Sequence, residues 1–217
     1  MKKLISILTP LFLLVTVSAK AEVGIGITGA VHMIDGTGTE TTRTSGQKNN
    51  GSHSKDVNVA EIFVEAIADN GVVLGLSYIP TRDMGSKSRS DSNGGGDTGT
   101  YKAEAELANV AQLYLDFPIA EAMSQSVYIK VGAQHVTLKT LESLNSGSTY
   151  PDADLLGYTV GLGMKGDLPY GNNLYYKADV TYTDFESYEA DSDGSTGNKV
   201  VADLDDTAVK LSIGYKF

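Results

Sequence analysis

From residue 23 to the carboxy terminus, apolar residues recur at every second position in eight separate segments. A period of two, with apolar side chains on one face only, predicts a β-strand lying between two different environments. In the last segment, the apolar face is formed by Val209, Leu211, Ile213, Tyr215 and Phe217. The predicted strands are 23–33, 57–68, 72–79, 101–117, 127–134, 156–165, 174–183 and 207–217.

The two faces of these strands differ in a way that favours one architecture. One face carries repeated glycines beside acids and bases, whereas the apolar face often ends in Tyr or Phe. An apolar belt outside and a polar interior are typical of a membrane β-barrel. A soluble β-sandwich also alternates, and alternation alone leaves it open. Asn109, on the apolar face of the fourth strand, is the clearest exception to the pattern.

The connections alternate between short and long. Short links are predicted at 69–71, 119–126 and 167–173, and long ones at 34–56, 80–100, 140–154 and 186–200. This alternation predicts an all-β fold, an eight-stranded antiparallel up-and-down transmembrane β-barrel, with periplasmic termini and extracellular long loops. Residues 37–54 and 85–100 are rich in Gly, Ser, Thr and Asn, so we expect both loops to be mobile.

The amino terminus predicts export. Lys2 and Lys3 precede an apolar stretch, and small residues end it before Glu22. We therefore expect a cleaved signal peptide over residues 1–21 and a barrel over 22–217. Without Lys2, Lys3 and Lys20, 14 basic residues face 27 acidic ones, a formal charge of −13. Such acidity argues against nucleic acid as a partner, and the lack of cysteine excludes disulfides.

The chain resembles the small outer-membrane barrels of Gram-negative bacteria typified by the OmpA transmembrane domain, OmpX and the opacity proteins. The resemblance covers residues 22–217 and depends on architecture and on Tyr215-Lys-Phe217. It implies an assembly signal recognised by the barrel assembly machinery, formed by Phe217, Tyr215, Ile213 and Leu211. It also implies contact with outer-membrane lipid and lipopolysaccharide. Nothing follows the last strand, so no peptidoglycan-binding domain is expected.

Charged residues on the non-apolar face are the candidate functional residues. A barrel of eight strands is only wide enough to be filled by side chains, so charges inside it must pair. Such a network either rigidifies the barrel as a plug or lines a narrow ion path. The residues predicted to face the lumen are Glu61, Glu65, Glu104, Glu106, Asp116, Lys130, Lys165, Lys177, Asp179 and Lys210.

Signals for catalysis and metal binding are weak. His135 and Thr137 share a strand face, but no acid is fixed beside them by spacing. His32 is predicted to point inward near the first loop. Residues 189–194 resemble the first half of a calcium loop, but Val200 occupies the closing ligand position. We therefore expect no catalytic residue, metal or cofactor.

The sequence thus predicts a non-enzymatic outer-membrane barrel with a structural role. Long extracellular loops would contact host-cell or phage surface ligands. A narrow ion or small-solute channel is the alternative interpretation, and a lipid A-modifying enzyme is a distant third.

Overall fold

The computed structural model describes residues 21–43, 45–91, 99–143, 149–169, 173–193 and 197–217. The predicted signal peptide lies almost entirely outside the described residues. No helix in the described ranges is long and apolar enough to cross a membrane. The strands are β1 (Ala21–Thr41), β2 (Lys48–Ala68), β3 (Val73–Ile79), β4 (Arg82–Asp91), β5 (Gly99–Ala122), β6 (Gln125–Ser143), β7 (Ala153–Asp167), β8 (Leu174–Phe185), β9 (Tyr188–Asp191) and β10 (Lys199–Lys216).

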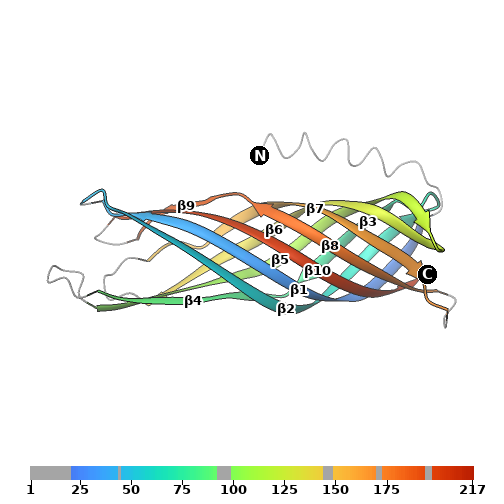
Figure 1. Cartoon of the computed structure of the whole chain (residues 1–217), viewed down its shortest axis with the longest axis horizontal. Coiled ribbons are helices and arrows are strands. Elements are labelled where there is room, and N and C mark those ends of the chain that lie inside the picture. Colours follow the sequence, from blue (N-terminus) through green and yellow to red (C-terminus); the bar gives the residue numbers. More distant parts are fainter. Residues whose placement is uncertain (1–20, 44, 92–98, 144–148, 170–172, 194–196) are drawn as a thin grey trace.

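The strands form a closed antiparallel ring (Figure 1). Each of two short strands shares a position in the wall with the strand before it. β3 and β4 both pair with β5, and β8 and β9 both pair with β10. Within the described residues the ring therefore has eight positions. It closes where β1 pairs with β10, from Gly24 opposite Lys216 to Thr41 opposite Lys199. The predicted eight-stranded up-and-down β-barrel is confirmed.

Large apolar side chains cover the outside of one half of the barrel. Ile27, Leu211, Leu162 and Ile62 are each more than half exposed, and their strand neighbours point into the interior. A packed soluble sandwich would bury this face. The exposed belt is therefore the inverted arrangement that a membrane barrel requires.

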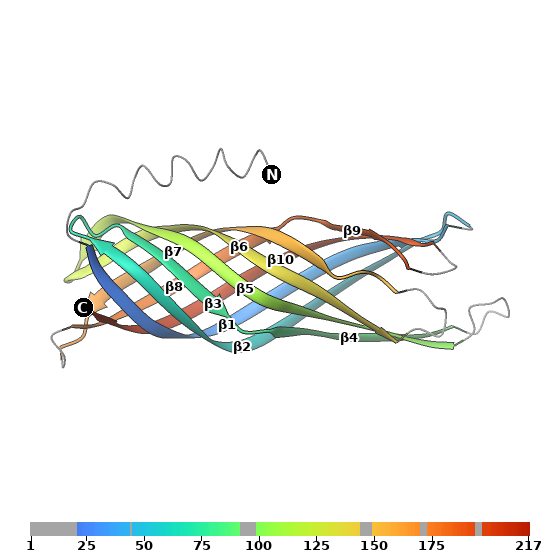
Figure 2. The same ribbon diagram turned by 180° about the vertical axis from the view of Figure 1, so that it is seen from behind.

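Two tight turns lie at the end of the barrel near the carboxy terminus (Figures 1 and 2). Gly71 has a φ of 82°, and the Asn70 side chain accepts a hydrogen bond from the Val72 N–H. Met123 and Ser124 link β5 to β6 with φ values of 53° and 63°. Positive φ at both central residues is the two-residue turn that matches the twist of a hairpin. The predicted link over 119–126 was therefore too long.

The connections at the other end are shorter than predicted. The span 34–56 is mostly strand, because β1 and β2 stay paired until Thr41 and Lys48. The expected mobile loop over 37–54 is thus wrong, and a hairpin replaces it. Strands also occupy parts of 80–100, 140–154 and 186–200, while residues 92–98, 144–148 and 194–196 lie outside the described ranges. Backbone pairing needs no apolar side chains, so polar Thr, Gly and Asn residues concealed these strand ends.

Asn109 marks a β-bulge in β5. Its φ is 53°, and the pairing with β6 shifts between Ala108 and Ala111. An extra residue reverses which side chains face inward on one side of the bulge. Leu107 is therefore fully buried in the interior, although it was predicted to lie on the outer apolar face.

Candidate functional site

The interior of the barrel consists of a charged half and an apolar half. The charged half lies inside the exposed apolar belt, and the apolar half lies toward the end with the longer connections. The charged half decides whether the barrel is open from end to end.

The charged layer nearer the end with the tight turns is centred on Lys177. Its Nζ donates hydrogen bonds to Glu65 Oε2 at 2.9 Å and to Asp116 Oδ2 at 2.7 Å. Lys130 donates to Asp116 Oδ1 at 2.6 Å and lies 3.6 Å from Asp179. All five side chains are buried. Each charge thus has an opposite partner, as burial in a dry interior requires.

Three tyrosines complete this layer. The hydroxyls of Tyr114 and Tyr175 donate to Glu65, and that of Tyr128 donates to Asp179. Glycines on neighbouring strands make room for the rings, since a Cβ at Gly75, the partner of Tyr114 on the adjacent strand, would lie closer than 3.0 Å to the Tyr114 ring. This explains why glycines accompany charges on the inner face.

A second charged layer lies next to the first, on the side of the longer connections. Asp206 Oδ2 is 2.6 Å from Arg82 Nη1 and 2.7 Å from His32 Nδ1, while His32 Nε2 is 2.9 Å from Glu61 Oε1. Lys210 Nζ lies 2.9 Å from the same Glu61 oxygen. Every member of this layer is buried, and His32 and Arg82 have no exposed surface.

Neutral polar groups fill the space around these two layers. Thr28 and Ser212 share a hydrogen bond, and Gln112 and Gln134 each donate to Thr159. A void between the two layers has a volume of about 20 Å³. That is room for about one water molecule. The described part of this half is therefore a filled plug.

The structure brings together seven of the ten predicted lumen charges. These are Glu61, Glu65, Asp116, Lys130, Lys177, Asp179 and Lys210. Lys165 lies opposite Lys177 on the neighbouring strand and is half-buried near the turn end.

Glu104 and Glu106 were predicted to belong to the lumen charge network, and for them this prediction was wrong. The bulge at Asn109 places Ala105 and Leu107 inward, so the two glutamates do not point into the charged layers, and Glu104 instead borders the wider cavity beyond them. Glu104 is paired with Lys102 and stays partly exposed. Neither glutamate belongs to the buried network.

Arg82 and Asp206 were missed as members of the second layer, whereas the inward direction of His32 was correct. Asp206 shares the inward period of Lys210 and Ser212, so extending the last strand by one residue would have found it. Arg82 follows Pro80, which indicated a loop and gave no strand signal.

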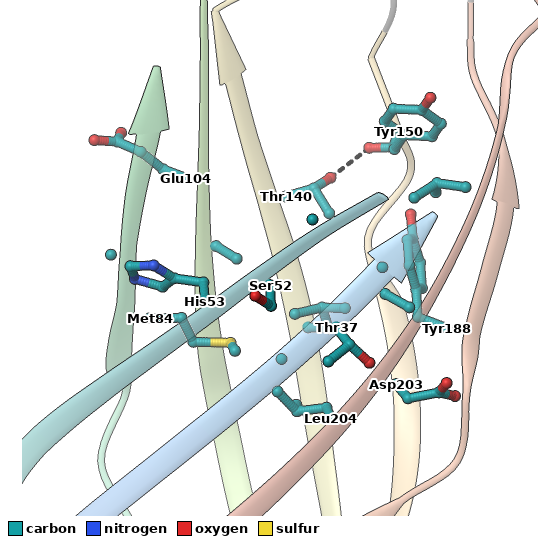
Figure 3. A pocket seen from close by; sticks show the side chains of 18 of the residues that line it. Thr37, Ser52, His53, Met84, Glu104, Thr140, Tyr150, Tyr188, Asp203 and Leu204 are labelled. Atoms are coloured by element: carbon teal, nitrogen blue, oxygen red, sulfur yellow. Dashed lines mark hydrogen bonds between the residues drawn. The ribbon is translucent and has the colours of Figure 1, made fainter. Parts of the chain in front are cut away.

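Above the second layer, the interior is apolar and hollow. Ile34, Leu107, Val136 and Phe185 are among the buried side chains that separate the charges from a cavity of about 310 Å³. Figure 3 shows Met84 and Leu204 toward one end of this cavity, and Tyr150 and Tyr188 toward the other. Thr140 donates a hydrogen bond to the Tyr150 carbonyl, which holds that end in place.

The barrel wall is interrupted beside this cavity. β2 pairs with β3 from Ile62 to Ile67, but no ladder joins the rest of β2 to β4 in the described residues. Figures 1 and 2 show β2 and β4 diverging beyond β3. Lys55 of β2 and Asp83 of β4 form an ion pair across this seam, at 2.9 Å. Residues of both strands, including Ser52 and Met84, line the cavity.

The structure places an acid, Asp154, beside the candidate catalytic pair His135 and Thr137, but the three side chains do not have the geometry of a catalytic triad. Thr137 Oγ1 donates to Asp154 Oδ1 at 2.8 Å, while His135 Nε2 is 4.0 Å from the same oxygen. A nucleophile needs the imidazole as its base, with the acid behind it. Here the acid lies between the two, and His135 and Asp154 are both more than half exposed.

The terminal residues lie where the sequence predicted. Leu211, Ile213, Tyr215 and Phe217 are exposed on the outer face, and the rings of Tyr215 and Phe217 meet edge to face at 4.9 Å. Their action as an assembly signal stays a prediction.

Comparisons with known proteins agree with this architecture. No protein-family model and no curated protein sequence matches the chain. Among solved structures, the outer membrane protein OprG from Pseudomonas aeruginosa is 16% identical with a TM-score of 0.62, covering 92% of this chain and 98% of its own. The outer membrane protein AlkL, solved in DMPC lipid bilayers, is 16% identical with a TM-score of 0.55, covering 92% of both chains. At this identity the likeness concerns the fold, and the chain has the fold of the small outer-membrane β-barrels.

Proposed function

We propose that this protein is an integral outer-membrane barrel that accepts a small apolar molecule in the apolar half of its interior. The observation that carries the proposal is the apolar cavity of about 310 Å³, which lies directly above a charged plug. Ligand pockets are typically about 300–1,000 Å³ and mostly apolar. The exposed apolar belt and the outer-membrane proteins that share the fold support the location.

The plug determines which route a ligand takes. An apolar molecule gains nothing by crossing layers of buried ion pairs, whose separation is costly. The seam between β2 and β4 borders the same cavity, and within the described residues it has no backbone ladder to break. We therefore infer that the ligand passes sideways through this seam, between the cavity and the membrane surface.

A methyl NMR experiment tests the cavity. The protein, labelled at its methionine methyls in lipid nanodiscs, is titrated with decanol. Met84 lines the cavity, whereas Met164 is exposed on the outer face and serves as an internal control. We expect a saturable shift of Met84 that is lost in Ala202→Trp, which fills the cavity, and kept in the neighbouring outward variant Val201→Trp. Shifts of Met84 and Met164 that rise together without saturation would overturn the proposal.

The narrow channel is the second candidate, and the plug argues against it. Planar-bilayer recording of the folded barrel is expected to show no discrete conductance. Steps that change when Lys130 is neutralised would favour a channel instead. Surface interaction through the loops, the leading interpretation of the sequence, stays a prediction. Loss of cell or phage attachment on deleting residues 92–98, which lie between β4 and β5, would support it.

A further inference from the structure

Arg82 is a buried cation with an unused hydrogen-bonding edge. It is the first residue of β4, and no part of it is exposed. Only Nη1 is bonded, to Asp206 and His32, and neither Nε nor Nη2 has a partner among the described residues. Burying guanidinium N–H groups without acceptors is costly. The Nε–Nη2 edge is also one of the forks with which arginine holds a carboxylate through two parallel bonds.

The position of Arg82 connects this edge to the cavity. Met84 follows it by two residues on β4, and Leu204 precedes Asp206 by two on β10; both line the cavity. Leu107, opposite Arg82 on β5, belongs to the apolar cluster around the cavity. One layer of side chains thus separates the guanidinium from the cavity. Met84 is unbranched and flexible, so this layer can rearrange around a ligand.

The charges around Arg82 also suit an anion. Asp206 faces both Arg82 and His32, and Glu61 faces both His32 and Lys210. Three basic side chains therefore meet two carboxylates in this layer.

We propose that Arg82 binds the acidic head group of the cavity's ligand, which is therefore an apolar chain ending in one carboxylate. This inference rests on the proposed function and narrows it. The apolar wall accepts the chain, and the Nε–Nη2 edge receives the carboxylate. A molecule with a second charged group does not fit, because the cavity lining offers it few polar partners.

The test compares decanoate with decanol, two ligands of equal chain length that differ in the head group. The folded protein in nanodiscs is observed at about pH 8 through the Met84 methyl and the arginine Nε–H signals. The chain has three arginines, so Arg82→Lys assigns the signal and also removes the fork while keeping the charge. We expect decanoate to shift both Met84 and the Arg82 Nε–H. It should bind about tenfold more tightly than decanol, since hydrogen bonds to charged groups are the strong ones. In Arg82→Lys this advantage of decanoate over decanol should disappear.

The outcomes separate the two proposals. If both ligands shift Met84 with equal affinity and the Arg82 Nε–H does not move, the carboxylate inference is wrong and the apolar cavity stands. If neither ligand shifts Met84, the proposed function itself fails. If Arg82→Lys does not fold, the comparison of decanoate with decanol on the unmodified protein still tests whether Arg82 binds the carboxylate.

Discussion

Replacing Lys177 by methionine tests whether the plug stabilises the barrel. The side chain keeps similar length but loses the ammonium that joins Glu65 and Asp116 at 2.9 and 2.7 Å. Each hydrogen bond to a charged group contributes about 1.5–3 kcal/mol. Glu65 keeps two tyrosine hydroxyls and Asp116 keeps Lys130, which softens the loss. Removing one partner of a buried ion pair typically costs about 3–5 kcal/mol, and we expect a loss of that size.

The free energy of unfolding is measured by urea titration in lipid vesicles, followed by far-ultraviolet circular dichroism because the chain has no tryptophan. Lys216→Met is the matched control. Lys216 pairs with the exposed Asp167 at 2.9 Å, and such a surface pair contributes about 1 kcal/mol or less. If Lys177→Met costs no more than Lys216→Met, the plug does not stabilise the barrel as we argue.

Three further predictions follow from other contacts. Gly75→Ala, whose Cβ would overlap the Tyr114 ring, should lower the unfolding free energy by about 1–3 kcal/mol, whereas Gly29→Ala, with open space around it, should have little effect; equal losses would contradict the packing argument. Lys55 and the Gly85 N–H hold the pKa of Asp83 below its usual 3.8, so the β2–β4 contact should be complete above that pH and weaken as the pH falls through the lowered pKa. Hydrogen exchange in β2 should then rise on acidification, and Asp83→Asn should remove that dependence; an unchanged pH response in the variant would sink the idea. Tyr215→Ala with Phe217→Ala should reduce folded barrel in the membrane without reducing secretion, which heat-modified gel mobility measures; normal folded levels would refute the assembly signal.

The barrel and most of its plug followed from the sequence because both depend on a period of two. Once the inner face of a strand is known, Lys130, Lys177 and Asp179 must point into a narrow lumen and pair there. The same rule failed in β5, because a bulge at Asn109 reverses the faces and no local signal other than the misplaced polar residue revealed it. Glu104 was consequently assigned to a charge network to which it does not belong.

The cavity and the seam were beyond prediction from sequence. The cavity exists because apolar residues of β4, β6, β7 and β10 meet only in the closed ring. The seam exists because β4 pairs with β5 and not with β2. The sequence of a strand does not show which other strand it pairs with. Arg82 was hidden for the same reason, since its role depends on side chains such as Asp206, 124 residues away.

The closure of the ring by β1 and β10 has a consequence for how the chain folds. Thr28 and Ser212, hydrogen-bonded across this closure, are separated by 184 residues. Contacts between such distant parts of a chain must await nearly all of the others, which slows folding. Until β10 arrives, β1 and β8 each present an unpaired edge, the feature that invites aggregation. We therefore expect a chain truncated before residue 199 to aggregate, because β1 and β8 would both keep an unpaired edge.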